Sequence, residues 1–160
     1  MCTPTRVLAL LAVSILAAGC DDSPTEPGDV PVSFETIALA SFSGFSAPRQ
    51  QVVRTDGDWA GAWETLYAGQ SPVPPLPAID FARQVVVLAA MGPKSNGCFR
   101  VEVTGVTRKA RVSLEIEVTD FEPGPSCGCP TVVTQPAHVV KLDRFDGPEQ
   151  FVLRRRQVSC

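Results

Sequence analysis

Alternating hydrophobic and polar positions predict β-strands in the second half of the chain. Phe99, Val101 and Val103 alternate with polar residues, and the 112–118 segment repeats the pattern. A period of two is typical of a strand with one face on the core and the other in water. Gln84–Met91 is almost continuously apolar and rich in valine, which indicates a strand buried on both faces. Shorter strands are expected at 35–40, 51–54, 131–134, 139–142 and 150–154.

One segment has the spacing of an amphipathic helix. Thr55 and Asp58 fit a capping box, in which each side chain satisfies a free N–H at the start of a helix. Gly69 is expected to end the helix. Large aromatics at helical spacing predict that two tryptophans anchor the core. The apolar face, at i, i+3, i+4 and i+7, consists of Trp59, Ala62, Trp63 and Leu66.

These elements predict an α+β domain, a mostly antiparallel sheet or open barrel of about seven strands with one packed helix. Thr107–Ala110 is expected to close a hairpin between the two alternating strands. The proline-rich run Ser71–Pro77 is expected to be an extended surface connection. Pro136 is expected at a bulge or a sheet edge, because proline has no N–H to donate.

The N-terminus has the pattern of a secretory signal peptide. Arg6 precedes an apolar run over Val7–Ala18, and small residues stand directly before Cys20. This order, Leu16-Ala17-Ala18-Gly19-Cys20, resembles the lipobox of bacterial lipoproteins. The resemblance implies cleavage after residue 19 and acyl chains, palmitate among them, on Cys20. The alternatives are an ordinary signal peptide with a chance cysteine or a short N-terminal anchor, although the run falls short of the roughly 20 apolar residues of a membrane span.

The chain is therefore expected to have three parts. Residues 1–19 are the signal peptide, residues 20–32 are the lipidated cysteine and a flexible tether, and residues 33–160 are a single domain. The tether is rich in proline and acids, so it cannot bury enough apolar surface to offset its ordering entropy. Several acyl chains on one residue give stable anchoring to a membrane. We therefore expect an extracytoplasmic, lipid-anchored protein of the bacterial cell envelope.

The charge balance argues against one class of partner. The chain has 17 Asp and Glu residues against 14 Lys and Arg, which gives a formal net charge of −3. A nucleic-acid-binding surface is typically basic, so no nucleic-acid partner is expected. The basic cluster Arg154–Arg156 is expected to be a solvated C-terminal end.

Four cysteines remain in the expected mature domain: Cys98, Cys127, Cys129 and Cys160. An even number in an exported chain indicates two disulfides. A bond between Cys127 and Cys129 would be strained across a single residue. We therefore expect Cys98 to pair with Cys127 or Cys129, and Cys160 to pair with the other. Two alternatives stay open, namely a redox pair at Cys127 and Cys129, or zinc bound by cysteines together with His138.

A set of landmarks keeps a fixed order between Val53 and Leu142. They are Val53-Arg54, the Trp59 and Trp63 helix, Asp80-Phe81 before Gln84-Val85-Val86, Gly97–Val103, and Thr134–Val140. This ordered set resembles the C-terminal domain of PrcB, an accessory component of a secreted bacterial protease complex. The resemblance implies an extracytoplasmic domain, often lipid-anchored, that assists a protein partner such as a protease and has no established catalysis.

Two residues are candidates for a ligand or a structural role. His138 is the one histidine of the chain, so a Ser-His-Asp triad would need it as the base. It stands among valines on a predicted strand, which favours a structural hydrogen bond. Asp80 precedes a strand, where aspartate commonly caps a turn.

Three glutamates, Glu102, Glu115 and Glu117, fall on the wet faces of the predicted hairpin. A glycosidase needs two carboxylates roughly 5–10 Å apart in a cleft. We expect ordinary surface pairs here instead, with Arg100 opposite Glu117. The sequence has no phosphate-binding glycine loop, nucleotide fingerprint or HExxH motif, so no cofactor is predicted.

Together these patterns predict a non-enzymatic, lipid-anchored binding or accessory module that assists a protease or another cell-surface protein. Two alternatives stay open. One is an extracytoplasmic hydrolase that uses His138 or the surface glutamates. The other is a thiol-redox or metal module at Cys127 and Cys129.

Overall fold

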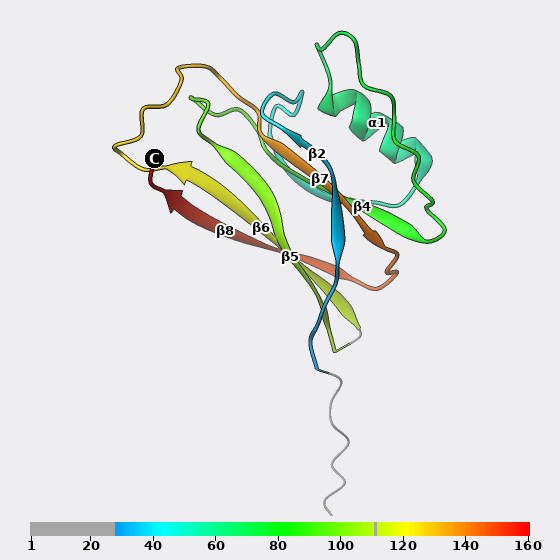
Figure 1. Ribbon diagram of the computed structural model, residues 1–160. Coiled ribbons are helices and arrows are strands. Elements are labelled where there is room, and N and C mark those ends of the chain that lie inside the picture. The colour runs from blue at the N-terminus through cyan, green and yellow to red at the C-terminus, as the bar shows by residue number, and fades with distance from the viewer. Residues whose placement is uncertain (1–27, 111) are drawn as a thin grey trace, which may run out of the picture.

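A computed structural model describes residues 28–110 and 112–160 of the protein. The predicted signal peptide, Cys20 and most of the predicted tether lie outside these residues. The described part has eight strands and one helix, and the predicted α+β class is confirmed (Figure 1). The elements are β1 (Val30–Pro31), β2 (Phe34–Ala40), β3 (Pro48–Val53), α1 (Asp56–Leu66), β4 (Gln84–Met91), β5 (Arg100–Lys109), β6 (Ser113–Pro123), β7 (Ala137–Asp143) and β8 (Glu149–Val158).

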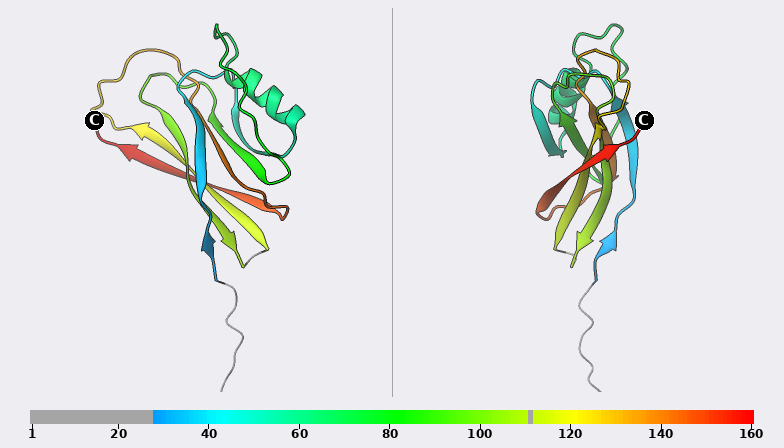
Figure 2. Two further views of the ribbon diagram at one scale, coloured as in Figure 1. Left: turned by 45° about the vertical axis from the view of Figure 1, so that its right-hand side comes forward. Right: turned by 90° about the vertical axis from the view of Figure 1, so that its left-hand side faces the viewer.

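The strands form two sheets of four. Sheet A has the order β1-β5-β6-β8, and sheet B has the order β2-β7-β4-β3. Antiparallel pairing predominates, and β6 with β8 is a parallel pair. Figure 2 shows the two sheets as neighbouring layers, with α1 on the side of sheet B that faces away from sheet A. Of the two expected forms, the residues that the structure describes adopt open sheets and no closed barrel.

Strand β4 is buried on both faces, as its valine-rich sequence predicted. Val85, Val87 and Ala89 pack into the layer between the sheets. Val86 and Leu88 point the other way and pack under the helix. Every residue from Val85 to Met91 is at most 3% exposed. The alternating strands β5 and β6 contribute one apolar face each to the layer between the sheets, also as predicted.

The helix begins and packs as its sequence predicts. Thr55 accepts a hydrogen bond from the backbone N–H of Asp58, 3.2 Å away, which caps the first turn. Trp59, Trp63 and Leu66 are the buried face of the helix on sheet B. The two indole rings meet edge to face with centroids 5.1 Å apart, an arrangement that aromatic pairs favour.

Two expected elements differ in the structure. The strand predicted at 131–134 is wrong, because the segment forms only isolated bridges at Thr134 and Gln135. Pro130 and Pro136 bracket this segment, and each lacks the N–H that a continuous ladder needs. The hairpin predicted to close at Thr107–Ala110 has its turn further along the chain, between Lys109 and Ser113. β5 continues to Lys109, whose carbonyl accepts the N–H of Val112 at 2.9 Å.

Sheet pairing also begins earlier than residue 33, the expected start of the domain. Val30 and Pro31 pair with Arg108 and Thr107 of β5. The N–H of Val32 donates to the carbonyl of Val106 at 2.8 Å. The chain therefore joins sheet A as β1 before it crosses to sheet B as β2.

Candidate functional site

His138 joins the two sheets through both nitrogens of its ring. It lies on β7 and is 5% exposed. Its Nδ1 accepts a hydrogen bond from the backbone N–H of Val103 on β5, with 2.9 Å between the nitrogens. Because Nδ1 accepts, the ring proton sits on Nε2, which donates to Thr36 Oγ1 on β2, also 2.9 Å away.

The reason for this contact lies in strand β5. The neighbouring strand β1 pairs with β5 only at Thr107 and Arg108. The register between β5 and β6 also shifts between Val103 and Gly105. Within the described residues, β1 does not extend along β5 as far as Val103, and a buried donor without an acceptor is costly. His138 supplies that acceptor from the other sheet.

The surroundings of His138 favour the neutral form of its ring. Burial lowers the pKa of its ring below the ordinary value, and the opposing attraction of Glu102 is weaker. A catalytic base needs a free ring nitrogen within reach of the proton it takes. Both nitrogens of His138 are already engaged with the protein, so this geometry supports the structural role.

Asp80 caps a turn, the role that its position before a strand suggested. Its carboxylate accepts the N–H of Ala82 at 3.1 Å. Its carbonyl accepts the N–H groups of Arg83 and Gln84 at 2.9 and 2.7 Å. These contacts set the direction in which the chain enters β4.

The three glutamates form separate surface pairs. Glu102 pairs with Arg100 at 2.6 Å, and Glu115 pairs with Lys109 at 3.3 Å. The predicted pair of Arg100 with Glu117 is wrong. Glu117 lies opposite Gly105, and its carboxylate pairs with Arg154 of β8 at 3.3 Å.

Arg100 lies opposite Phe121 instead, with its guanidinium 4.2 Å from the ring centroid. The error follows from the turn, because a hairpin that closes later along the chain pairs each β5 residue with a later residue of β6.

The four cysteines form two disulfides, Cys98–Cys129 and Cys127–Cys160. This is one of the two pairings that the sequence left open. Cys127 and Cys129 are each bonded to a distant cysteine, so neither sulfur is available for the redox pair or for zinc. Among residues 28–110 and 112–160, no group of three or more His, Cys, Asp or Glu side chains could hold a metal ion. Two structural disulfides are typical of a protein that folds in an oxidising compartment outside the cytoplasm.

The disulfides stand at an open end of the layer between the sheets. A hollow of about 340 Å³ lies there, lined by Leu39, Phe99 and Val101 among other residues. Cys98 and Cys160, one from each disulfide, also line it. The bonds therefore hold two of its walls in place. Leu39 pairs with His138 in the ladder of sheet B, so the inter-sheet hydrogen bonds lie next to this hollow.

A second hollow adjoins the first at the end of β2. It has a volume of about 470 Å³ and shares Leu39, Ala40 and Ser41 with the first. Phe42 and Tyr67 line its apolar part. Gln70 holds this loop in place, since its side-chain amide donates to the Phe42 carbonyl at 2.8 Å.

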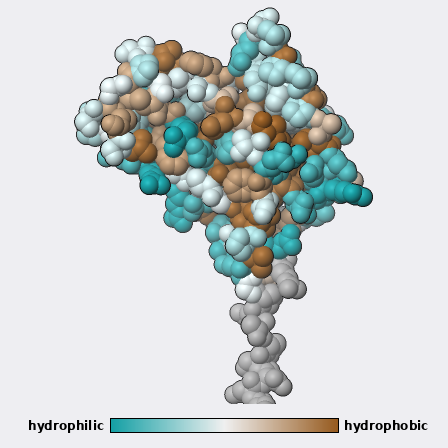
Figure 3. All heavy atoms as spheres, in the orientation of Figure 1, coloured by the Kyte–Doolittle hydropathy of each residue, from teal (hydrophilic) through white to brown (hydrophobic). Residues whose placement is uncertain are grey.

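Two large apolar side chains that line these hollows are exposed to solvent. Leu39 is 56% exposed and Phe42 is 51% exposed. In Figure 3, brown apolar residues gather near the upper end of β2, on the face toward the viewer. β2 is also the edge strand of sheet B, with β7 as its partner within the described residues. We refer to Leu39, Ala40, Ser41 and Phe42, with Phe99 and Tyr67 beside them, as the β2-end surface.

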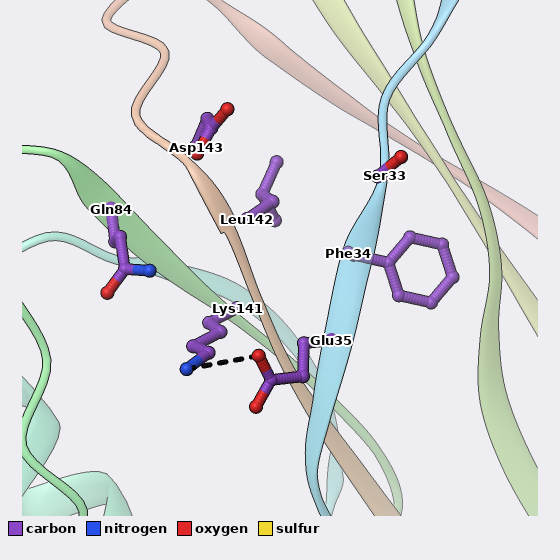
Figure 4. Close-up of a pocket in the computed structure, with 7 residues that line it drawn as sticks. All are labelled: Ser33, Phe34, Glu35, Gln84, Lys141, Leu142 and Asp143. Atoms are coloured by element: carbon purple, nitrogen blue, oxygen red, sulfur yellow. Dashed lines mark ion pairs between the residues drawn. The ribbon is translucent and has the colours of Figure 1, made fainter.

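A third hollow, of about 260 Å³, lies at the opposite end of sheet B. Figure 4 shows Lys141 and Glu35 pointing toward each other across it, with 3.2 Å between Nζ and Oε2. Phe34 points away from this pair and packs in the layer between the sheets. The Glu35 side chain is 70% exposed, so this is an ordinary surface ion pair. The charged groups that line the third hollow are Glu35, Lys141 and Asp143, and Glu35 and Lys141 neutralise each other.

Comparison with known families identifies the central part of the chain. Residues 85–143 match the family model described as PrcB C-terminal. The resemblance to the PrcB C-terminal family is thereby confirmed for this segment. It spans β4 to β7 and contains His138, Phe99 and Val101. No curated protein matches the chain, and no solved structure does.

The matched segment, the end of β2 and the C-terminal residues Val158 and Cys160 all contribute to the lining of the first hollow. Neither Leu39 nor Phe42 was singled out from the sequence, although a phenylalanine between Ser41 and Ser43 in a loop was a usable signal.

The sequence analysis also did not single out Asp120. Burial raises the pKa of its carboxyl, against the attraction of Lys94 and Arg155. It occupies an inward position of β6, where the alternation predicts an apolar residue.

Proposed function

We propose that the protein is a lipid-anchored, extracytoplasmic accessory module that binds a protein partner through the β2-end surface. The match to the PrcB C-terminal family supports a protease-associated accessory role, so a protease of the cell envelope is the first partner to test. The two disulfides support a site of action outside the cytoplasm. No helix in the described residues is long and apolar enough to cross a membrane.

The exposure of Leu39 and Phe42 is the observation on which the binding role depends. Isolated apolar residues are common on surfaces, but Leu39 lines both adjoining hollows and Phe42 lines the second of them. An edge strand can accept another extended chain through its backbone, while neighbouring pockets take alternate side chains. We therefore propose that the partner presents an extended segment with apolar side chains.

The membrane attachment is proposed from the N-terminal sequence. Cys20 follows small residues at the end of an apolar run, in the order of a lipobox. The tether from Cys20 to β1 would space the domain from the bilayer. Two acyl chains on Cys20 give stable anchoring, where one chain gives only marginal binding.

A hydrolase remains the alternative, and the geometry gives it little support. His138 uses both ring nitrogens in structural hydrogen bonds. Each of the three glutamates has its own cation nearby. An accessory role needs none of these groups to react.

The binding proposal is tested with two surface variants of the full chain in its native membranes. Leu39→Asp places a charge on the β2-end surface, and Val112→Asp places one in the hairpin loop, where Val112 is 67% exposed. Partners are captured by crosslinking under mild detergent and quantified by mass spectrometry. Leu39→Asp should lower the yield of the partner about tenfold, as expected for a central interface residue, and Val112→Asp should leave it unchanged. Equal yields from both variants would refute the binding surface.

The anchoring proposal is tested separately by Cys20→Ala. The intact mass of the wild-type mature protein should show loss of residues 1–19 and addition of acyl chains. The variant should lack both changes. An unmodified wild-type chain in the soluble fraction would refute the anchor but leave the binding surface to its own test.

A further inference from the structure

The proline-rich run after α1 is held against the helix by both tryptophans. Trp63 Nε1 donates to the carbonyl of Pro74 at 3.0 Å, and Trp59 Nε1 donates to the carbonyl of Pro77 at 2.9 Å. Both rings are buried, with 6% and 2% exposure, so the two donors are fixed in position. Figure 1 shows this green segment running back along α1 before it enters β4. We refer to residues 71–78 as the proline strap.

From Pro72 to Ala78, exposure along the proline strap repeats every three residues. Pro74 and Pro77 are half-buried, and they are also the residues whose carbonyls the indoles hold. Val73 and Leu76 are 53% and 47% exposed, and Pro72, Pro75 and Ala78 are exposed as well. Three residues per turn is the repeat of the polyproline II helix. The strap therefore has one side on α1 and two sides in solvent.

The solvent sides have the features of a polyproline II ligand. Within the described residues, the carbonyls of Val73, Pro75 and Leu76 accept no hydrogen bond from the protein. No charged residue occurs between Glu64 and Asp80. The indoles have already removed much of the freedom that a loose segment would lose on binding.

We propose that the proline strap is a second docking element, which a partner domain with a groove lined by aromatic side chains recognises. Val73 and Leu76 lie three residues apart on one exposed side, and they would fit between the aromatic rings of such a groove. Donors in the groove would bind the unused carbonyls. Side chains of the partner would thus bind the solvent sides of the strap, as Trp59 and Trp63 bind the side that faces α1. This proposal uses residues separate from the β2-end surface and does not depend on it.

The test places a photo-crosslinking amino acid at position 73 of the full chain in native membranes. The expected product is an adduct with a second protein, joined through a peptide that contains aromatic residues. Leu76→Asp should lower the yield of this adduct about tenfold, because a charge would enter the apolar groove. Leu39→Asp should leave it unchanged. The same amino acid at position 150, on β8, is the positional control and should give no such adduct.

A second variant tests whether the indole contacts prepare the strap. Trp63→Phe keeps an aromatic ring in the core and removes the N–H that holds Pro74. The adduct yield should fall about threefold as the strap loses its fixed form, while far-UV circular dichroism stays unchanged. No adduct at position 73 above that at position 150 would overturn the proposal. An adduct with lipid, with a second copy of this chain, or with yield indifferent to Leu76→Asp would also overturn it.

Discussion

The Nδ1 atom of His138 accepts the backbone N–H of Val103 at 2.9 Å, so a side chain of sheet B completes the backbone hydrogen bonding of sheet A. Replacing His138 with leucine keeps most of the volume and leaves the Val103 N–H buried without an acceptor. The free energy of unfolding should fall by about 1–3 kcal/mol. Urea denaturation measures the loss.

Thr36→Val is the matched control for His138→Leu, because it removes only the acceptor of the Nε2 proton, on an exposed edge residue. Thr36→Val should lower the free energy of unfolding by less than His138→Leu does, by about 0.5–1.5 kcal/mol. A His138→Leu protein as stable as the wild type would show that the link between the sheets contributes nothing.

Protonation of the His138 ring should make the stability of the protein depend on pH. Burial lowers the pKa of His138 in the folded protein below its ordinary value of 6.5. As the pH falls below 6.5, the unfolded chain binds a proton more readily than the folded one. Stability should therefore be complete above pH 6.5 and decline as the pH falls toward the lowered pKa. Unfolding midpoints between pH 8 and pH 5 measure this decline, and His138→Leu should flatten it. An equal slope in wild type and variant would contradict the assignment.

Gly44 lies too close to the end of α1 to carry a side chain. A Cβ at this position would lie 2.5 Å from the Thr65 carbonyl oxygen and 2.6 Å from Ala68 Cβ. Gly44→Ala should lower the free energy of unfolding by about 1–3 kcal/mol through this overlap. Gly61→Ala is the control, because a Cβ there meets nothing within 4 Å. Gly61→Ala should stabilise the helix by up to about 1 kcal/mol. Thermal unfolding of both variants measures the two changes in stability.

The two disulfides should contribute comparably to stability. They close loops of similar length, with sequence separations of 31 and 33. Replacing either pair by serine should cost about 2–4 kcal/mol by chain entropy. Only the variant without Cys127 and Cys160 should release the C-terminal end of β8, which hydrogen exchange of residues 154–158 would detect. Fast exchange there in the variant without Cys98 and Cys129 would contradict the separate roles.

Local patterns predicted the elements that depend on neighbours in the sequence. The cap at Thr55, the buried tryptophans and the doubly buried β4 follow from spacing alone. The pairing of Arg100 with Glu117 failed because register depends on where the hairpin turns. The strand expected at 131–134 failed because prolines on both sides removed its ladder donors.

The β2-end surface could not be predicted for a different physical reason. Leu39 pairs with His138, 99 positions later in the chain, and is exposed because β2 lies at the edge of its sheet. Nothing within the 34–42 segment reveals which strands will flank it. The hydrogen bonds of His138 likewise need β2, β5 and β7 together, so the sequence could indicate a structural role but not its partners.

The proposed binding role is tested most directly by photo-crosslinking from position 42 in native membranes, with position 112 as the control. The β2-end surface predicts one partner protein that crosslinks from position 42 and not from position 112, and that is lost in Leu39→Asp. Equal crosslinking from both positions, or no protein adduct from position 42, would contradict the proposal that this surface docks a partner.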